Sequence, residues 1–501
     1  MYKTIILLLF VGVFCQVPLL AQTQRLSLQQ QKEDFAIFKG ALQEGHAGLY
    51  YFIDKNSFQK KCDSIENTFT ENASIESFYL RLRYLIASLR HGHSGVSLPN
   101  KGNVNYRMAV LETQKLYLPF ELLIANNQLI IKEDCSKEQL FPRYAILKSI
   151  GNQTSQQLIQ KMLAYMPADG INETFKTYSL SQYFYFHFLY NLLYPNQNGV
   201  KIEIEKSQTH YYIELLTPKT VDSIYYAKNG KSISQYGTQL AYKANLPNKS
   251  AYIKIGTFYK GLIEQFGQNY EAFLANTFED IAKQKTKNVI VDLRNNEGGG
   301  DGYENILLQY LAAYKSAEKT VISVPAKQFK YTQYTVDITD DIKGFIDNPS
   351  EFLQNDSSLF IKEKYVDLMI EGRNAVAKHP YTGKLIILTN GGSFSASTTV
   401  IAALYQQRQT TQREVVFVGE ENGGDIYAVA SCSGQGYPVK LPASSIRIDM
   451  PFFCFGTLNT KYPKKKLPDY KVFDSPESLS KGADKVLDAA IKLSAKTTSK
   501  R

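Results

Sequence analysis

Residues 385–399 read Leu-Ile-Ile-Leu-Thr-Asn-Gly-Gly-Ser-Phe-Ser-Ala-Ser-Thr-Thr, an apolar strand pattern that turns through small residues into an apolar helix pattern. Residues 289–302 read Val-Ile-Val-Asp-Leu-Arg-Asn-Asn-Glu-Gly-Gly-Gly-Asp-Gly, a second apolar strand followed by a glycine cluster. In open α/β sheets, the ligand crevice lies at the carboxyl ends of the strands. The two junctions therefore predict an α/β domain with its functional site where they meet.

The sequence around these junctions alternates between strand and helix patterns from about residue 245 onward. Such alternation is typical of a layered α/β domain. The expected strands are 251–258, 288–293, 384–389 and 415–418, and the expected helices are 270–282, 303–313 and 396–406. The less regular stretch 326–380 is expected to be an insertion near the active site.

The sequence before the α/β region contains two further patterns. Apolar residues recur at three- and four-residue steps over 58–69 and 75–89, which predicts helices, with Ser74 as an N-cap. From about residue 113 the period changes to that of strands, with hairpins around Asn126-Asn127 and between 200 and 216. A strand at 145–150 and a helix at 155–163 complete this module. We expect it either to bind peptides by strand addition or to act as a spacer.

The first 21 residues contain Lys3, an apolar run over residues 5–13 and a small residue at the end, Ala21. This pattern predicts a secretory signal peptide cleaved near Ala21-Gln22. A permanent membrane anchor is the alternative, although the apolar run is short for a bilayer. Cleavage implies that the mature protein has no membrane span.

The composition is that of a globular protein, with 44% hydrophobic and 21% charged residues and only 31 Gly and 17 Pro in 501 positions. Disorder, collagen and coiled coil are excluded. The net charge of +10 is spread along the chain and no nucleic-acid motif accompanies it, so no nucleic-acid partner is expected. Four cysteines remain after the signal: Cys62, Cys135, Cys432 and Cys454. Cys432 and Cys454 are candidates for a cross-strand disulfide, although the sequence does not choose among the possible pairings.

Hydroxyl and backbone groups at the junctions are candidates for chemistry. Ser393, Ser395 and Ser397 compete for the mouth of the site, and helix capping is the alternative for Ser393 and Ser397. The glycines of 298–300 allow backbone N–H groups to approach a reacting oxygen. A nucleotide site is not favoured, because the spacing is not G-x-G-x-x-G and the lysine of a phosphate loop is missing.

The two junctions together resemble the tail-specific, or C-terminal processing, serine peptidases. Asp292-Leu-Arg-Asn-Asn-Glu-Gly-Gly299 is similar to the family's D-L-R-x-N-x-G-G segment, and Ser393-Phe-Ser-Ala-Ser-Thr398 to its S/T-A-S-A-S-E segment. Leu467-Pro-Asp-Tyr470 resembles its closing P-D segment. The resemblance implies a core similar to the Clp-protease and crotonase fold. It makes Ser395 the nucleophile, with an oxyanion hole from the N–H of Ala396 and of Gly298 or Gly299, Gly298 being the first choice.

The serine needs a base. The lysine of the processing-protease branch is absent from Val418-Gly-Glu-Glu-Asn-Gly-Gly-Asp425. His91-Gly-His-Ser-Gly95 instead resembles the D-G-H-T segment of the tricorn-like branch, which makes His93 the expected base and His91 the alternative. Neutral histidine accepts a proton near pH 7. We expect His46 to be structural, and the sequence offers no zinc or other metal motif.

An orienting carboxylate should complete the catalytic set. Glu420 is the nearest matching position, and Glu421 and Asp425 are alternatives.

The sequence thus predicts a secreted or periplasmic serine endopeptidase that needs no cofactor and acts on peptides or proteins. Its predicted parts are the signal 1–21, a helical domain 22–112, a module 113–220 that loosely resembles a PDZ domain, a catalytic domain 221–490 and a basic tail 491–501. An inactive peptide-binding relative of such a peptidase and an esterase are the alternatives.

Overall fold

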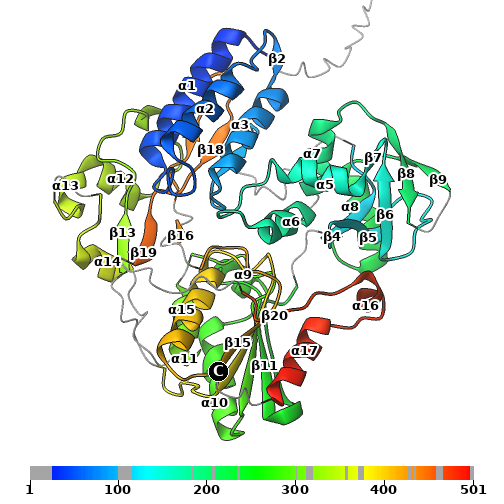
Figure 1. The fold of residues 1–501 in the computed structure, drawn as a ribbon, viewed down its shortest axis with the longest axis vertical. Helices are drawn as coiled ribbons and strands as arrows, with labels where there is room; N and C mark the ends of the chain where they lie inside the picture. Colours follow the sequence, from blue (N-terminus) through cyan, green and yellow to red (C-terminus); the bar gives the residue numbers. More distant parts are fainter. Residues whose placement is uncertain are drawn as a thin grey trace, which may run out of the picture.

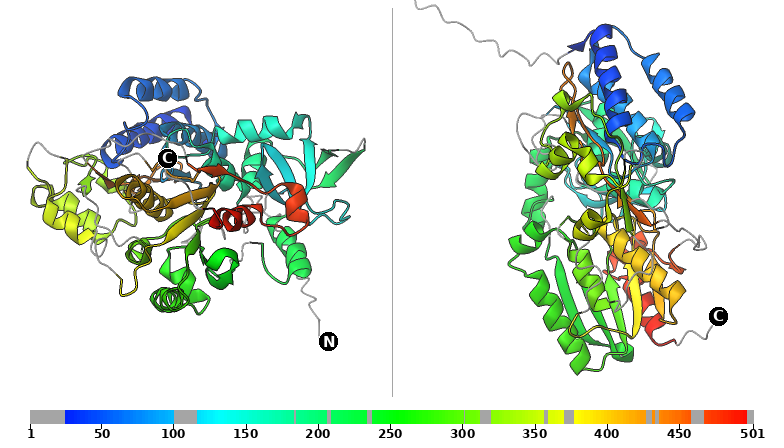
Figure 2. Two further views of the ribbon diagram at one scale, coloured as in Figure 1. Left: turned by 60° about the horizontal axis from the view of Figure 1, so that its bottom comes forward. Right: turned by 90° about the vertical axis from the view of Figure 1, so that its left-hand side faces the viewer.

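The computed structural model describes residues 25–99, 116–182, 185–205, 209–233, 237–300, 302–311, 320–355, 359–369, 377–426, 431–432, 436–457 and 467–496. Figure 1 shows a helical part at the top, a mixed module at the right and an α/β part at the bottom. The side view in Figure 2 likewise places the N-terminal helices and the α/β sheet at opposite ends. The predicted signal peptide lies outside the described residues.

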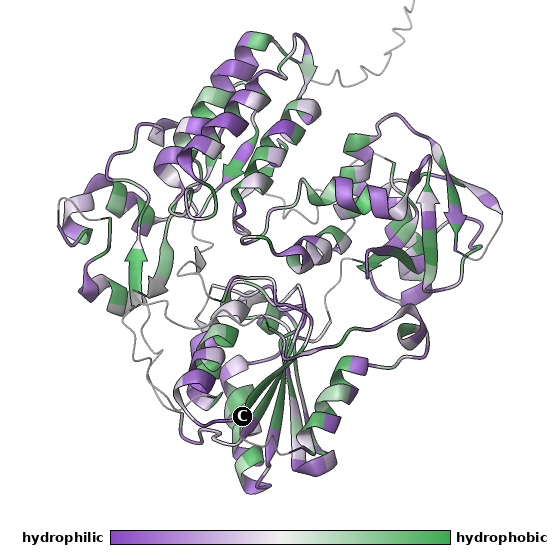
Figure 3. Cartoon of the chain, in the orientation of Figure 1, coloured by the Kyte–Doolittle hydropathy of each residue, from purple (hydrophilic) through white to green (hydrophobic). Residues whose placement is uncertain are grey.

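The α/β part is built on a six-stranded sheet of order β10-β11-β12-β14-β15-β20. Its strands are β10 (Leu240–Leu246), β11 (Ser250–Ile255), β12 (Asn288–Asp292), β14 (Lys384–Thr389), β15 (Val415–Gly419) and β20 (Tyr470–Lys471). All neighbours from β11 to β20 are parallel, and β10 adds an antiparallel edge. The central strands are mostly apolar (Figure 3), as expected for a sheet that is covered on both faces.

Alternate residues of each central strand pack on opposite faces of the sheet. On one face, Val289 and Ile387 pack with helices α9 (Lys260–Gln265), α10 (Tyr270–Lys283), α11 (Tyr303–Leu311) and α15 (Ala396–Thr410). On the other face, Ile290 and Ile386 pack with helix α17 (Lys485–Ser494). This two-residue period is that of a strand. The parallel pairing of β12 with β14 places their carboxyl ends side by side.

The mixed module has an antiparallel sheet of order β4-β5-β6-β8-β9, with β7 paired to β6. Its elements are β4 (Phe120–Ala125), β5 (Gln128–Asp134), β6 (Ala145–Ile150), β7 (Gln153–Thr154), α5 (Ser155–Leu163), α6 (Glu173–Ser181), α7 (Tyr185–Leu193), β8 (Gly199–Ile204) and β9 (His210–Glu214). Asn126 and Asn127 both have positive φ, at 50° and 59°, which is the backbone of a tight hairpin turn. The predicted hairpin is therefore confirmed.

The N-terminal helices are α1 (Leu28–Gly45), α2 (Lys55–Glu66) and α3 (Ile75–Leu89). Ser74 caps α3 by accepting a hydrogen bond from the N–H of Ser77, as predicted. Short strands β1 (Arg25–Leu26) and β2 (Ala73–Ser74) pair beside them. Helix α8 (Pro218–Asn229) follows the mixed module, and its Val221 packs into the core of the N-terminal helices.

Two segments of the predicted catalytic domain pack with the N-terminal helices instead. Buried residues between 322 and 366 and between 437 and 453 share one hydrophobic core with α1, α2 and α3. Strand β3 (Gly95–Ser97), which follows the histidine segment, pairs with β18 (Arg447–Asp449), which pairs with β17 (Val439–Lys440). The elements of the first segment are β13 (Thr320–Ser323), η2 (Thr332–Tyr334), α12 (Asp340–Asp347), α13 (Pro349–Phe352) and α14 (Glu363–Met369). These two segments of the predicted domain 221–490 therefore share a core with the N-terminal helices.

Cys454, in β19 (Cys454–Thr457), is disulfide-bonded, and its backbone partner across the ladder is Cys432 in β16 (Ser431–Cys432). Cys62 and Cys135 are free thiols, both buried. The predicted basic tail 491–501 begins inside α17, which runs to Ser494 after α16 (Pro476–Ser480). Within the described residues, no helix is long and apolar enough to cross a membrane.

Candidate active site

The two junctions form one structure at the carboxyl edge of the sheet. The N–H of Phe394 donates to the carbonyl of Asn296 at 3.1 Å, and Leu293 N–H donates to the carbonyl of Leu388 at 3.0 Å. Parallel pairing brings Asp292 opposite Leu388, so both chains leave the sheet at the same place. The sequence prediction that the junctions meet is therefore confirmed.

The structure separates the three candidate serines. Ser393 and Ser397 are fully buried, and their hydroxyls donate to the carbonyls of Leu293 and Asn296, each at 2.8 Å. Ser395 is only partly buried and stands at the N-cap of α15, where its side chain makes no capping hydrogen bond.

The backbone of Ser395 is held in an unusual conformation. Its φ is 54° and its ψ is −119°, a combination that residues other than glycine rarely adopt. Backbone strain of this kind persists only where the surroundings impose it, and it clusters at functional sites. The strained turn sets the Ser395 hydroxyl apart from those of its buried neighbours.

His93 stands opposite this hydroxyl. Its Nε2 lies 3.0 Å from Ser395 Oγ, across 302 positions of sequence. The imidazole stacks on the ring of Phe394 at 4.5 Å between centroids, and Phe394 stacks on Phe175 of α6 at 4.1 Å. Burial, with a smaller effect from His91, lowers the pKa of His93 to about 4. The ring is therefore neutral near pH 7 and can accept a proton.

The other two histidines of this region have structural partners. His91 is buried, and its Nε2 donates to the carbonyl of Gly48. His46 is buried as well, with its Nε2 2.7 Å from Ser94 Oγ and its ring 4.7 Å from that of His91. Burial lowers the pKa of both rings, that of His91 to about 4. The structure thus brings His93 to Ser395 and leaves His91, the alternative base, in a packing role.

The backbone N–H group that we expected to be the distal oxyanion donor already has a hydrogen-bond acceptor. The N–H of Gly298 donates to Asn296 Oδ1 at 2.9 Å, so the first choice for the distal oxyanion donor is already engaged in this conformation. Gly298 is needed for space instead, because its φ is +101° and a Cβ there would lie 2.7 Å from the Cβ of Ser395. In the described part of the chain, the N–H groups of Gly299 and Ala396 have no acceptor.

The expected orienting carboxylate is not found beside His93. Glu420 accepts a hydrogen bond from the N–H of Gly391 and faces Lys471, and burial raises the pKa of its carboxyl. No hydrogen bond joins the ring of His93 to a carboxylate among the residues that the structure describes. Glu420 is therefore not placed as the third catalytic residue. The imidazole of His93 is stacked on the ring of Phe394 instead.

The mixed module supplies contacts to the site that local sequence patterns could not predict. Asp169 Oδ1 accepts a hydrogen bond from the N–H of Gly92 at 2.8 Å. Asn172, the N-cap of α6, donates through Nδ2 to the carbonyl of Asn422 at 2.7 Å, and Thr174 donates to the carbonyl of Glu421 at 2.9 Å. Only the capping role of Asn172 carried a local signal. The site is thus assembled from the N-terminal helices, the mixed module and the α/β part.

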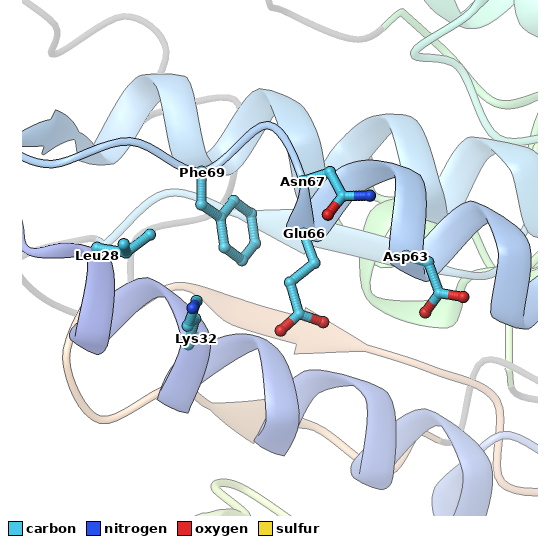
Figure 4. Close-up of a pocket in the computed structure, with 6 residues that line it drawn as sticks. All are labelled: Leu28, Lys32, Asp63, Glu66, Asn67 and Phe69. Atoms are coloured by element: carbon cyan, nitrogen blue, oxygen red, sulfur yellow. The ribbon is translucent and has the colours of Figure 1, made fainter.

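Elsewhere, an open pocket lies between α1 and α2, and Figure 4 shows its lining. The lining residues are Leu28, Lys32, Asp63, Glu66, Asn67 and Phe69. None of these side chains belongs to the site around Ser395. Over the described ranges, no group of His, Cys, Asp and Glu side chains is arranged to hold a metal ion.

Comparisons with known proteins concern the fold and the family. Mature CPAF complexed with lactacystin superposes with a TM-score of 0.62 at 12% identity, covering 93% of this chain and 98% of that chain. Mature CPAF gives a TM-score of 0.59 at 12% identity, with coverage of 93% and 97%. These likenesses show a common fold. No curated protein sequence matches the chain. The sequence model of "Peptidase family S41" matches residues 249–430, which contain both junctions and Ser395. The resemblance to C-terminal processing peptidases is therefore confirmed over this part of the chain.

Proposed function

We propose that the protein is a serine endopeptidase that cleaves peptide bonds through an acyl-enzyme on Ser395. The observation that carries the proposal is the 3.0 Å separation of Ser395 Oγ and His93 Nε2 at a strained strand-to-helix turn. A nucleophile within hydrogen-bond reach of a neutral base is the arrangement that activates a serine hydroxyl.

The reaction begins when the Ser395 hydroxyl attacks the peptide carbonyl carbon and His93 Nε2 takes the hydroxyl proton. The carbonyl oxygen becomes an oxyanion, and backbone N–H groups stabilise it. The N–H of Ala396, at the positive end of the α15 dipole, is one donor. Gly299 is the second in the present conformation, and Gly298 becomes available if its bond to Asn296 opens. His93 returns the proton to the leaving amine, and water then hydrolyses the ester.

A serine-directed fluorophosphonate tests the nucleophile. We expect the probe to label the wild type and the Ser223→Ala control, an exposed helical serine, and to fail on Ser395→Ala. Equal labelling of Ser395→Ala would contradict the proposal. Peptide binding without labelling or turnover would favour an inactive peptide-binding protein. Hydrolysis of short acyl esters but not of peptides would favour an esterase.

We also infer that the protein is exported after cleavage near Ala21-Gln22. The disulfide at Cys454 supports this, because structural disulfides persist in oxidising compartments. N-terminal sequencing of the mature protein is expected to start at Gln22, and a retained Met1 would contradict the inference.

A further inference from the structure

We propose that Asp169, in the mixed module, is a positioning residue that holds His93 against Ser395. This rests on the proposed function, because it concerns the same base and nucleophile. Asp169 lies between α5 and α6, far in sequence from both the histidine segment and the α/β part.

The carboxylate of Asp169 joins two segments of the site. Its Oδ1 accepts the N–H of Gly92 at 2.8 Å, directly before His93, and it also accepts the N–H of Asp425 in the α/β part. The next residue, Gly170, donates its N–H to the carbonyl of Arg90 at 2.9 Å, so a second bond ties the loop of Asp169 to the histidine loop. One side chain thereby fixes the distance between the histidine loop and the chain beyond β15.

The packing around Gly92 leaves this loop little freedom. A Cβ at Gly92 would lie 2.7 Å from the ring of Phe394 and 3.2 Å from Asp169 Oδ1. The loop is therefore held between the carboxylate and the ring that also stacks on His93. A shift of Gly92 would move the imidazole away from Ser395 Oγ, and hydrogen-bonded proton transfer is sensitive to such displacement.

The ionised carboxylate of Asp169 suits its two partners better than a neutral side chain of the same shape would. Both partners of Asp169 are N–H donors, and the ionised form accepts hydrogen bonds at either oxygen, whereas an amide keeps a single acceptor oxygen and a protonated acid turns one oxygen into a donor. Burial, with a smaller effect from the neighbouring charge of Asp425, raises the pKa of Asp169 to about 6. Among the described groups, Asp425 is the one whose charge acts on Asp169. His93, with a pKa of about 4, titrates at lower pH.

Kinetics of Asp169→Asn, Asp169→Ala and the control Asp134→Asn test the proposal. Asp134 is another carboxylate of the mixed module that accepts two backbone N–H groups, from Ser136 at 2.8 Å and Phe141 at 3.0 Å, and its partners belong to its own module. We expect both Asp169 variants to lose about ten-fold or more in kcat and in fluorophosphonate labelling rate, with KM nearly unchanged. Asp134→Asn is expected to lower Tm and to keep kcat.

The pH profile separates positioning from folding. Wild-type kcat should fall as the pH drops through about 6 and approach that of Asp169→Asn, which mimics the protonated acid. A wild-type kcat and an unchanged pH profile in Asp169→Asn would overturn the proposal, and this variant carries the test if Asp169→Ala does not fold. Loss of labelling in Ser395→Ala alongside active Asp169 variants would leave the peptidase assignment standing, whereas labelling of Ser395→Ala would remove that assignment itself.

Discussion

Ser395 Oγ and His93 Nε2 lie 3.0 Å apart, although 302 positions separate them in the chain. The pair joins the N-cap of α15 to the loop that follows α3. His91, two residues before His93, turns its ring to the carbonyl of Gly48 instead. The two histidines therefore have separable roles, and substitution distinguishes them.

The base is tested by substituting each histidine with glutamine. His93→Gln should reduce kcat/KM by about 10²- to 10⁴-fold, because it removes the general base. His91→Gln keeps an N–H donor for Gly48 and should keep most of the activity. Peptide-cleavage kinetics measure both, and equal losses in the two variants would argue against His93 as the base.

Gly298 gives a second prediction, on space beside the nucleophile. Gly298→Ala would place a Cβ 2.7 Å from that of Ser395 and force alanine to a φ of +101°. Strain of this kind costs about 1–3 kcal/mol, so we expect the labelling rate to fall sharply. Gly300→Ala is the matched control, since nothing lies within 4 Å of a Cβ there. Indistinguishable rates for the two variants would refute the steric argument.

Arg294 connects the end of β12 to the start of α17. It pairs with Asp292 at 2.6 Å and with Asp484, the N-cap of α17, at 2.7 Å. Arg294→Met leaves the buried Asp292 without its cation, and breaking a buried pair costs about 3–5 kcal/mol. We expect a clearly lowered Tm.

The control for Arg294 is Lys283→Met, which breaks an exposed pair between Lys283 and Glu279. Exposed pairs contribute little to stability, so its Tm should stay close to that of the wild type. Thermal unfolding measured at low and high salt checks both variants. A wild-type Tm in Arg294→Met would show that the network does not secure α17.

The burial of His187 makes the stability of the folded protein depend on pH. Burial lowers its pKa to about 3, below the value of about 6.5 in an unfolded chain. The unfolded state therefore binds the proton first, so this stability is fully present above pH 6.5 and is lost as the pH falls towards 3. The slope is about 1.4 kcal/mol per pH unit.

His187→Gln removes this titration, and its Tm should fall less between pH 6.5 and 4 than that of the wild type. His210→Gln, at an exposed position on β9, serves as the control and should follow the wild-type curve. Parallel curves for all three proteins would contradict the role assigned to His187.

Local sequence patterns predicted many of the strands and helices. The predicted bounds of β6, α5 and β14 agree with the structure. Strands and helices of this kind can be predicted because the spacing of their apolar residues, every two or every three to four positions, is visible in a short stretch of sequence. The same patterns missed α12 and β18, whose apolar residues pack against helices hundreds of positions away. Only long-range packing shows that these segments belong with the N-terminal helices.

The sequence by itself determined the strand-to-helix junction at Ser395, the glycine loop at 298–300 and a short choice of histidines, since each depends on residue type and local spacing. The tertiary structure decided which serine is accessible, which histidine reaches it, and that Asp169 holds the histidine loop. These are distances between segments remote in the chain. Local sequence patterns do not predict such distances, because they arise from how three hydrophobic cores pack together.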